Sequence, residues 1–150
     1  MYKKVLIAVI VCAIMALFGG IIYAGTTAPD VIKMEEPGYE KHKKGIVEFT
    51  HKKHATEYKA TCGECHHDDK GKPLELKEGD DVQKCIECHT KPSEKPKGKD
   101  APKLTDAQEL EYHAEALHQN CKDCHKKYNK ENKTKAAPTT CTKCHPKTKK

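Results

Sequence analysis

Cys62-Gly-Glu-Cys65-His66 is the first of four copies of one pentapeptide pattern in this chain of 150 residues. The other copies are Cys85-Ile-Glu-Cys88-His89, Cys121-Lys-Asp-Cys124-His125 and Cys141-Thr-Lys-Cys144-His145. Cys-x-x-Cys-His is the attachment signature of c-type haem. The two thiols add to the two vinyl groups of one porphyrin, and the His that follows binds the iron. The sequence therefore predicts four covalently bound haem c groups that make up most of the interior.

Zinc knuckles and thioredoxin-like dithiols also contain two Cys separated by two residues. Neither kind of site requires a His directly after the second Cys. A zinc site built from the thiolates of two motifs would also leave these four His unused. The pattern therefore favours haem over zinc or a disulfide. Eight of the nine Cys belong to the motifs, and the ninth, Cys12, lies in an N-terminal apolar segment.

The N-terminus has the layout of an export signal. Lys3 and Lys4 precede an apolar run that is followed by small residues up to Ala24 and Gly25. We therefore expect residues 1–24 to be a signal peptide that is removed after Ala24. The alternative is an uncleaved anchor, because the apolar stretch is long enough to span a bilayer. Both alternatives place residues 25–150 in the periplasm, with membrane contact only if the segment stays uncleaved.

Residues 25–150 are expected to form a single tetrahaem domain with few large apolar side chains. The sequence contains no Trp, and Phe49 is the one Phe beyond the N-terminal segment. Four porphyrins would supply the missing hydrophobic surface, so folding should be coupled to haem attachment. We expect a small, mainly α multihaem cytochrome fold with long loops, little or no sheet and four haems as its core.

Local sequence patterns predict a few short elements. Thr105-Asp-Ala-Gln108 is a capping box, and the helix that it starts is expected to run into the third haem motif. The other expected elements are extended segments near residues 31–34 and 45–49, a helical turn within residues 50–59, a turn at residues 68–73, an exposed loop at residues 91–103 and a polar linker at residues 128–138.

The charge of the chain is uneven. Residues 121–150 hold ten Lys and two acidic residues, a net charge of +8, whereas residues 25–120 hold 16 Lys and 20 acidic residues, a net charge of −4. The chain has no Arg to bind phosphates, so we expect no nucleic acid partner. A Lys-rich face around an exposed haem edge, directed at an acidic redox partner, is the functional interpretation that we favour.

Each iron needs a second axial ligand besides the His of its motif. Six further His and one Met, Met34, are available beyond the N-terminal segment, so two His ligands on every iron is the economical arrangement. It lacks the thioether that raises the potential of Met/His cytochromes, so low potentials are expected. His51 and His54 share one helical face and must therefore serve two different haems. His67 is placed to reach a neighbour of the haem that His66 binds.

The remaining three His differ in what we expect of them. His113 and His118 are five residues apart and cannot serve one site. His42 lies among Lys41, Lys43 and Lys44, so we expect it to be solvated rather than a ligand.

Phe49-Thr-His51-Lys-Lys-His54, followed by Cys62-Gly-Glu-Cys65-His66-His67 and three more haem motifs, resembles class III cytochrome c, the tetrahaem cytochrome c3 family. The resemblance covers roughly residues 30–148. It implies a small, loop-rich fold around four closely packed haems. This chain departs from the family in three features. One is that two His, His113 and His118, are candidates for the second ligand of haem 4. The other two concern the motif spacing and the length of one loop. All four motifs have two residues between the Cys, where haems 2 and 4 of many members have four, and the loop at residues 91–103 is long.

The resemblance also implies the second axial ligand of each haem. His51 serves haem 1, bound at Cys62 and Cys65; His67 serves haem 2, bound at Cys85 and Cys88; His54 serves haem 3, bound at Cys121 and Cys124. A His upstream of the third motif serves haem 4, bound at Cys141 and Cys144. We choose His118 over His113, because the helix places it on the face of Cys121 and His125.

In function, the resemblance implies a low-potential periplasmic electron carrier of anaerobic respiration rather than an enzyme. Its partners would be redox proteins such as hydrogenase, formate dehydrogenase or membrane-bound cytochrome complexes, docked through the Lys-rich face at haem 4. The first alternative is a multihaem reductase or metal-reducing cytochrome with one open haem. A second is a conductive filament of stacked haem proteins, which no feature of the sequence supports.

Overall fold

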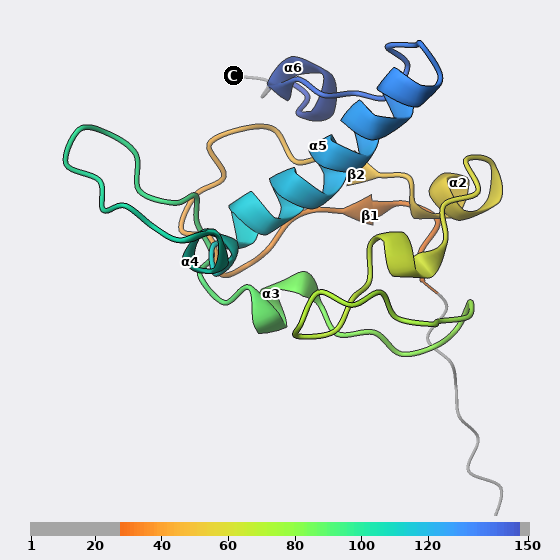
Figure 1. Ribbon diagram of the computed structural model, residues 1–150, viewed down its shortest axis with the longest axis horizontal. Coiled ribbons are helices and arrows are strands. Elements are labelled where there is room, and N and C mark those ends of the chain that lie inside the picture. The colour runs from red at the N-terminus through yellow and green to blue at the C-terminus, as the bar shows by residue number, and fades with distance from the viewer. Residues whose placement is uncertain (1–27, 148–150) are drawn as a thin grey trace, which may run out of the picture.

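The computed structural model describes residues 28–147. The predicted signal peptide, Cys12, Lys149 and Lys150 lie outside the described residues. Within residues 28–147, no helix is long and apolar enough to cross a membrane. The described chain consists of helices and loops with one sheet of two short strands, which confirms the expected fold class (Figure 1).

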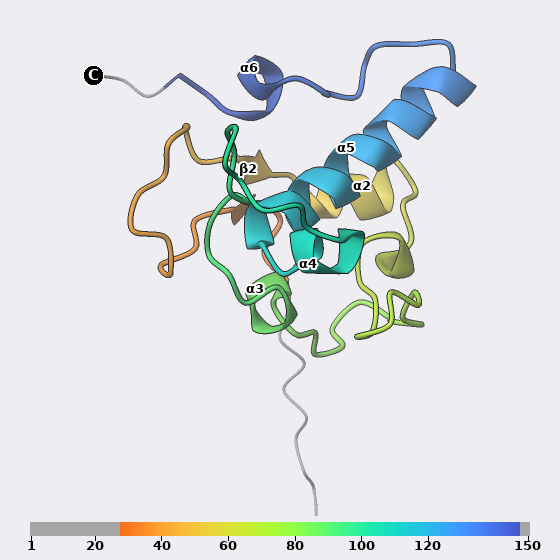
Figure 2. The same cartoon turned by 60° about the vertical axis from the view of Figure 1, so that its left-hand side comes forward.

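A long helix, α5, crosses the middle of the molecule, and α2, α3 and α6 are arranged around it in both views (Figure 1 and Figure 2). In chain order the elements are β1 (Ile32–Lys33), β2 (Glu48–Phe49), α2 (His51–Thr56), the 3-10 helix η1 (Cys62–Glu64), α3 (Cys85–Cys88), α4 (Asp106–Leu110), α5 (His113–Glu131) and α6 (Cys141–Cys144).

The two strands fix the start of α2. They pair antiparallel, with Ile32 opposite Phe49, where the sequence predicted two extended segments. The ring of Phe49 lies 4.6 Å from the ring of His54 and 5.8 Å from that of His51, centre to centre. The sheet therefore holds an aromatic ring against the helical turn that carries two of the predicted ligands.

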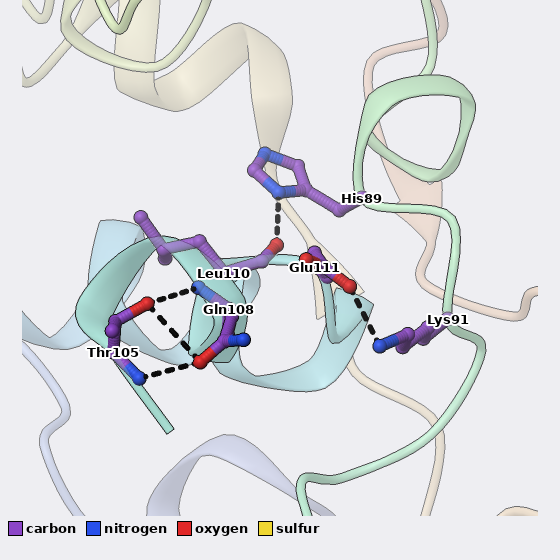
Figure 3. A network of polar contacts seen from close by, with 6 residues as sticks. All are labelled: His89, Lys91, Thr105, Gln108, Leu110 and Glu111. Atoms are coloured by element: carbon purple, nitrogen blue, oxygen red, sulfur yellow. Dashed lines mark hydrogen bonds and ion pairs between the residues drawn. The ribbon is translucent and has the colours of Figure 1, made fainter.

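The capping box predicted at Thr105 is present and begins α4. The Gln108 backbone N–H donates to Thr105 Oγ1 at 3.3 Å, and the Thr105 backbone N–H donates to Gln108 Oε1 at 2.9 Å (Figure 3). Each bond satisfies a backbone donor that the first turn of a helix leaves without a partner.

The helix does not continue unbroken into the third motif, so that part of the prediction is wrong. Tyr112 is extended (φ −82°, ψ 114°), and it separates α4 from α5. The cause is a pairing with a segment distant in the sequence. The Lys91 N–H donates to the Glu111 carbonyl, and the His113 N–H donates to the Lys91 carbonyl, each at 2.9 Å. The ion pair of Lys91 Nζ with Glu111 at 2.6 Å reinforces this contact (Figure 3).

Helix α5 also extends further than predicted, because its last residue is Glu131 and the polar linker was expected from Tyr128. The expected loop at residues 91–103 has neither helix nor strand of its own.

The polypeptide forms almost no core by itself. Among residues 28–147, Ala116 is the one buried hydrophobic residue, at 8% exposure, and His113 the one buried polar residue, at 7%. A domain of this size normally draws its stability from buried apolar surface. The fold therefore has the thin polypeptide core that the sequence predicted for a chain built around haem.

We predict that the chain prepared without haem attachment lacks cooperative unfolding, because burial of its own side chains is too small to offset the loss of chain entropy. Differential scanning calorimetry should show a sharp transition for the haem-loaded protein and none for the apoprotein. A cooperative apoprotein transition, with well-dispersed amide signals in NMR spectra, would contradict the coupling of folding to haem attachment.

Candidate haem-binding site

One helical turn separates the two Cys of each motif. In the second and fourth motifs the two Cys are the first and last residues of α3 and α6, and the third motif lies within α5. In the first motif η1 begins at Cys62 and is followed directly by Cys65. Side chains three residues apart on a helical turn lie on the same face. Each motif therefore presents both thiols to one side, as attachment to a single porphyrin requires. The eight thiols form no disulfides.

Three of the motif His face an imidazole from a distant segment. The ring centres are 6.2 Å apart for His125 and His54, 5.9 Å for His89 and His67, and 6.2 Å for His145 and His118. Imidazole nitrogens bind first-row transition metals at about 2 Å, so two rings on opposite sides of one ion have centres about 6 Å apart. Each of these pairs is spaced to hold one iron between its rings.

The remaining motif His, His66, lies in the same region as His51 of α2. Burial lowers the pKa of His66, and the neighbouring charges of His51 and His67 lower it further. The structure thus brings together the residues that the resemblance implies for haems 2, 3 and 4, and it places His51 within electrostatic reach of His66.

Backbone carbonyls hold five of these imidazoles in one orientation. The Nδ1 of His89 lies 2.5 Å from the Leu110 carbonyl oxygen (Figure 3). The Nδ1 of His125 lies 2.6 Å from the Pro138 carbonyl oxygen, and the Nδ1 of His145 lies 2.8 Å from that of Gly45. The Nδ1 of His54 lies 2.9 Å from the Thr50 carbonyl oxygen, and the Nδ1 of His67 lies 2.7 Å from that of Asp68.

A carbonyl oxygen can only accept, so Nδ1 must carry the proton at each of these five positions. The lone pair of the neutral ring then lies on Nε2, which is the nitrogen left free for a metal. Ligand imidazoles of metal sites are oriented in the same way. The donor set therefore fits haem iron in both its spacing and its protonation.

A glycine allows the contact whose two residues are furthest apart in the sequence. Gly45 and His145 are 100 residues apart in the sequence. A Cβ on residue 45 would lie 2.1 Å from the Pro146 carbonyl oxygen, so no other residue permits this approach without displacement. Sequence reasoning missed Gly45 because its partner lies at the other end of the chain and a single Gly after charged residues carries no local signal.

The first three motifs converge near the middle of the molecule. Burial raises the pKa of the Cys65 thiol to about 11, and the nearby thiols of Cys121, Cys124 and Cys85 raise it as well. The side-chain amide of Asn120 donates to the Cys65 carbonyl at 3.2 Å and joins the first motif to α5. Within the described part of the chain, these thiols do not come close enough to hold one metal ion, and no other group of three His, Cys, Asp or Glu side chains does so.

The two other His have partners that are not imidazoles of the motifs. His113 is buried and its Nδ1 lies 3.1 Å from the Tyr39 hydroxyl, and burial lowers its pKa. The Tyr39 ring stacks on His42, with centres 5.1 Å apart. His42 is therefore half-buried rather than fully solvated as expected, because Tyr39 covers one face of its ring.

The number of Lys that form ion pairs differs between two regions of the described chain. Around the loop at residues 91–103 three of the five Lys are paired with acids, as Lys95 is with Glu109 and Lys97 with Glu94. In the described part of the C-terminal region, residues 121–147, Lys126 with Asp123 is the one ion pair. The other Lys side chains of residues 121–147 form no ion pair.

Comparison with known proteins gives two kinds of match. The family model described as the class III cytochrome c family matches residues 28–145. Cytochrome c3 of Maridesulfovibrio salexigens is 35% identical over 124 residues, which cover 81% of this chain and 98% of that protein. Cytochrome c3 of Desulfovibrio desulfuricans is 31% identical over 122 residues, 80% of this chain and 97% of that protein. These matches confirm the resemblance drawn from the motifs.

Proposed function

The chain belongs to the class III cytochrome c family, and we propose that it is a low-potential periplasmic electron carrier with two His ligands on each of its four haems. Membership of the family establishes the four haem c groups and the role of a multihaem electron-transfer cytochrome. The compartment, the potentials, the ligand of each iron and the partners are our proposal.

The imidazole pairs carry this proposal. His125 with His54, His89 with His67 and His145 with His118 are each spaced for one iron, and His51 is close to His66. We assign His125 and His54 to haem 3, and His89 and His67 to haem 2. We assign His145 and His118 to haem 4, and His66 and His51 to haem 1. An iron with both axial positions filled has no place for a substrate, so the arrangement supports a carrier rather than an enzyme.

Each bound haem supplies a one-electron ferric–ferrous couple. The chain's own residues determine how that couple behaves. The Cys pairs would fix the position of the porphyrin, and the His pairs would exclude other ligands from the metal. Imidazole on both sides also favours the ferric state over the arrangement with a thioether, which supports low potentials.

We predict that the haem-loaded protein contains four low-spin haems, all with negative midpoint potentials, and that the reduced protein does not bind carbon monoxide. A pyridine haemochrome assay, together with the intact mass of the protein, gives the number of haems. A potentiometric titration followed by visible and EPR spectra gives the midpoint potentials and the spin states. A high-spin fraction above trace, or carbon monoxide bound at one haem, would instead favour the alternative of a reductase with an open haem.

We predict that His118→Met raises one of the four midpoint potentials and introduces the red absorption band of Met–iron ligation, because a thioether is the weaker donor to ferric iron. The matched control is His113→Gln, which keeps a polar partner for the Tyr39 hydroxyl and should leave all four potentials unchanged. If the His113 variant shifts a potential and the His118 variant does not, the ligand of haem 4 is His113.

We propose that an acidic surface of a redox partner, such as a hydrogenase, a formate dehydrogenase or a membrane-bound cytochrome complex, docks at haem 4. The support is the excess of Lys over acid in residues 121–150 and the shortage of ion pairs among the described Lys of that region. Unpaired charge of one sign steers association with a partner of opposite sign. The alternative is that these Lys serve only solubility.

We predict that Lys143→Glu with Lys147→Glu slows electron transfer from a hydrogenase-type donor, and that added salt slows the wild-type rate, since charges beyond about 8–10 Å are screened. The control is Lys70→Glu with Lys77→Glu, two exposed residues near the first motif. The Lys41–Lys44 cluster is unsuitable as a control, because Gly45 beside it contacts His145. Equal slowing by both pairs, or a rate indifferent to salt, would contradict docking at haem 4.

A further inference from the structure

One side chain fastens the segment between the third and fourth motifs to α5. The Asn129 side-chain amide donates to the Ala137 carbonyl at 2.8 Å, and the Ala137 N–H donates to Asn129 Oδ1 at 3.1 Å. Both backbone groups of Ala137 are therefore satisfied by a single half-buried side chain. We call this pair of hydrogen bonds the Asn129 clamp.

The clamp lies directly beside a ligand contact. Pro138 follows Ala137, and the Pro138 carbonyl accepts from Nδ1 of His125 at 2.6 Å. Asn129 is four residues after His125, one turn further along the same helix. The clamp thus holds the residue next to the oxygen that faces the imidazole. Among residues 28–147, the same oxygen has one other side-chain contact, with the Cys144 thiol at 3.9 Å, which would be lost when Cys144 is bonded to haem.

The rest of the turn depends on local contacts that do not reach the ligand. The Thr134 N–H donates to the Asn129 carbonyl at 2.9 Å, and the Ala136 N–H donates to Thr134 Oγ1 at 3.2 Å. The side chain of Asn132 donates to the Tyr128 carbonyl within α5 at 3.0 Å. Pro138 has no N–H of its own. Within the described residues, the Asn129 side chain makes the side-chain hydrogen bonds that hold Ala137.

The four assigned pairs differ in how many of their rings meet a carbonyl. Both rings do so for haem 2 and for haem 3, and one ring, that of His145, does so for haem 4. Among residues 28–147, neither His51 nor His66 of haem 1 has a hydrogen-bond partner for its ring. A carbonyl at Nδ1 makes Nε2 the stronger donor, which favours ferric over ferrous iron and lowers the potential.

We propose that Asn129 is a positioning residue for haem 3, which holds the Pro138 carbonyl against His125 and thereby keeps the potential of haem 3 below that of haem 1. The proposal rests on the assignment of His125 and His54 to one haem, made under the proposed function. Asn129 does not touch the iron and acts through the backbone of Ala137 and Pro138.

Asn129→Ala in the full haem-loaded protein tests the proposal. We expect the midpoint potential of haem 3, followed through its resolved methyl signals in NMR titrations, to become less negative while the other three move little. The control is Asn132→Ala, which removes the same kind of side chain from the same turn but frees no group near His125, and should shift none of the four.

The wild-type protein supplies a second measurement that does not depend on the variant folding. The Nδ1 proton of His125 should exchange with solvent more slowly than those of His51 and His66, and Asn129→Ala should accelerate its exchange. Equal exchange in the wild type, an unmoved haem 3 or an equal shift of all four haems would overturn the role of Asn129. Spectra showing that wild-type haem 3 lacks two His ligands would overturn the axial assignment as well, so the two failures are distinguishable.

Discussion

The hydrogen bond from the Nδ1 of a His to a backbone carbonyl is the contact on which the arrangement of this protein depends. It occurs at five of the eight assigned ligands, and in each case it fixes the ring, the tautomer and the direction of Nε2 together. Three of the five join segments distant in the sequence, as His89 is joined to Leu110 and His145 to Gly45. The same contacts therefore aim the ligands and connect the loops.

Such contacts have unusual weight here because packing contributes little. Ala116 and His113 are the two buried residues of the described chain, so side-chain interdigitation cannot position the loops as it does in most domains. The haems must supply the apolar surface, and the polypeptide must supply the directions from which they are held. From that division we expect single polar groups, such as the Gly45 carbonyl and the Asn129 amide, to matter more to the structure than typical surface residues do.

The parts of the structure that sequence could predict are those with local causes. The Cys pairs are set by a spacing of one helical turn, and the start of α4 is set by the reciprocal bonds of Thr105 and Gln108. The break at Tyr112 could not be predicted, because its cause is Lys91, which pairs with the backbone on both sides of the break. Gly45 and Asn129 were missed because each contact has a backbone group on one side: the Gly45 carbonyl faces His145, and the Asn129 side chain bonds the backbone of Ala137. No pattern of side chains reveals such contacts. The ligand pairs themselves came from the family resemblance, which encodes non-local contacts that spacing alone cannot.

Ion pairs shape the charge of the surface more than its stability. Exposed pairs such as Lys91 with Glu111 and Lys97 with Glu94 stabilise a fold only weakly. They do cancel charge locally, and three of the five Lys of the loop at residues 91–103 have such an acid partner. In the described part of the C-terminal region, one Lys, Lys126, has such an acid partner. The long loop and the C-terminal region are thus both rich in Lys but differ in how many of their Lys are paired, because acids of α4 and its flanks face the loop and acids are scarce near α6.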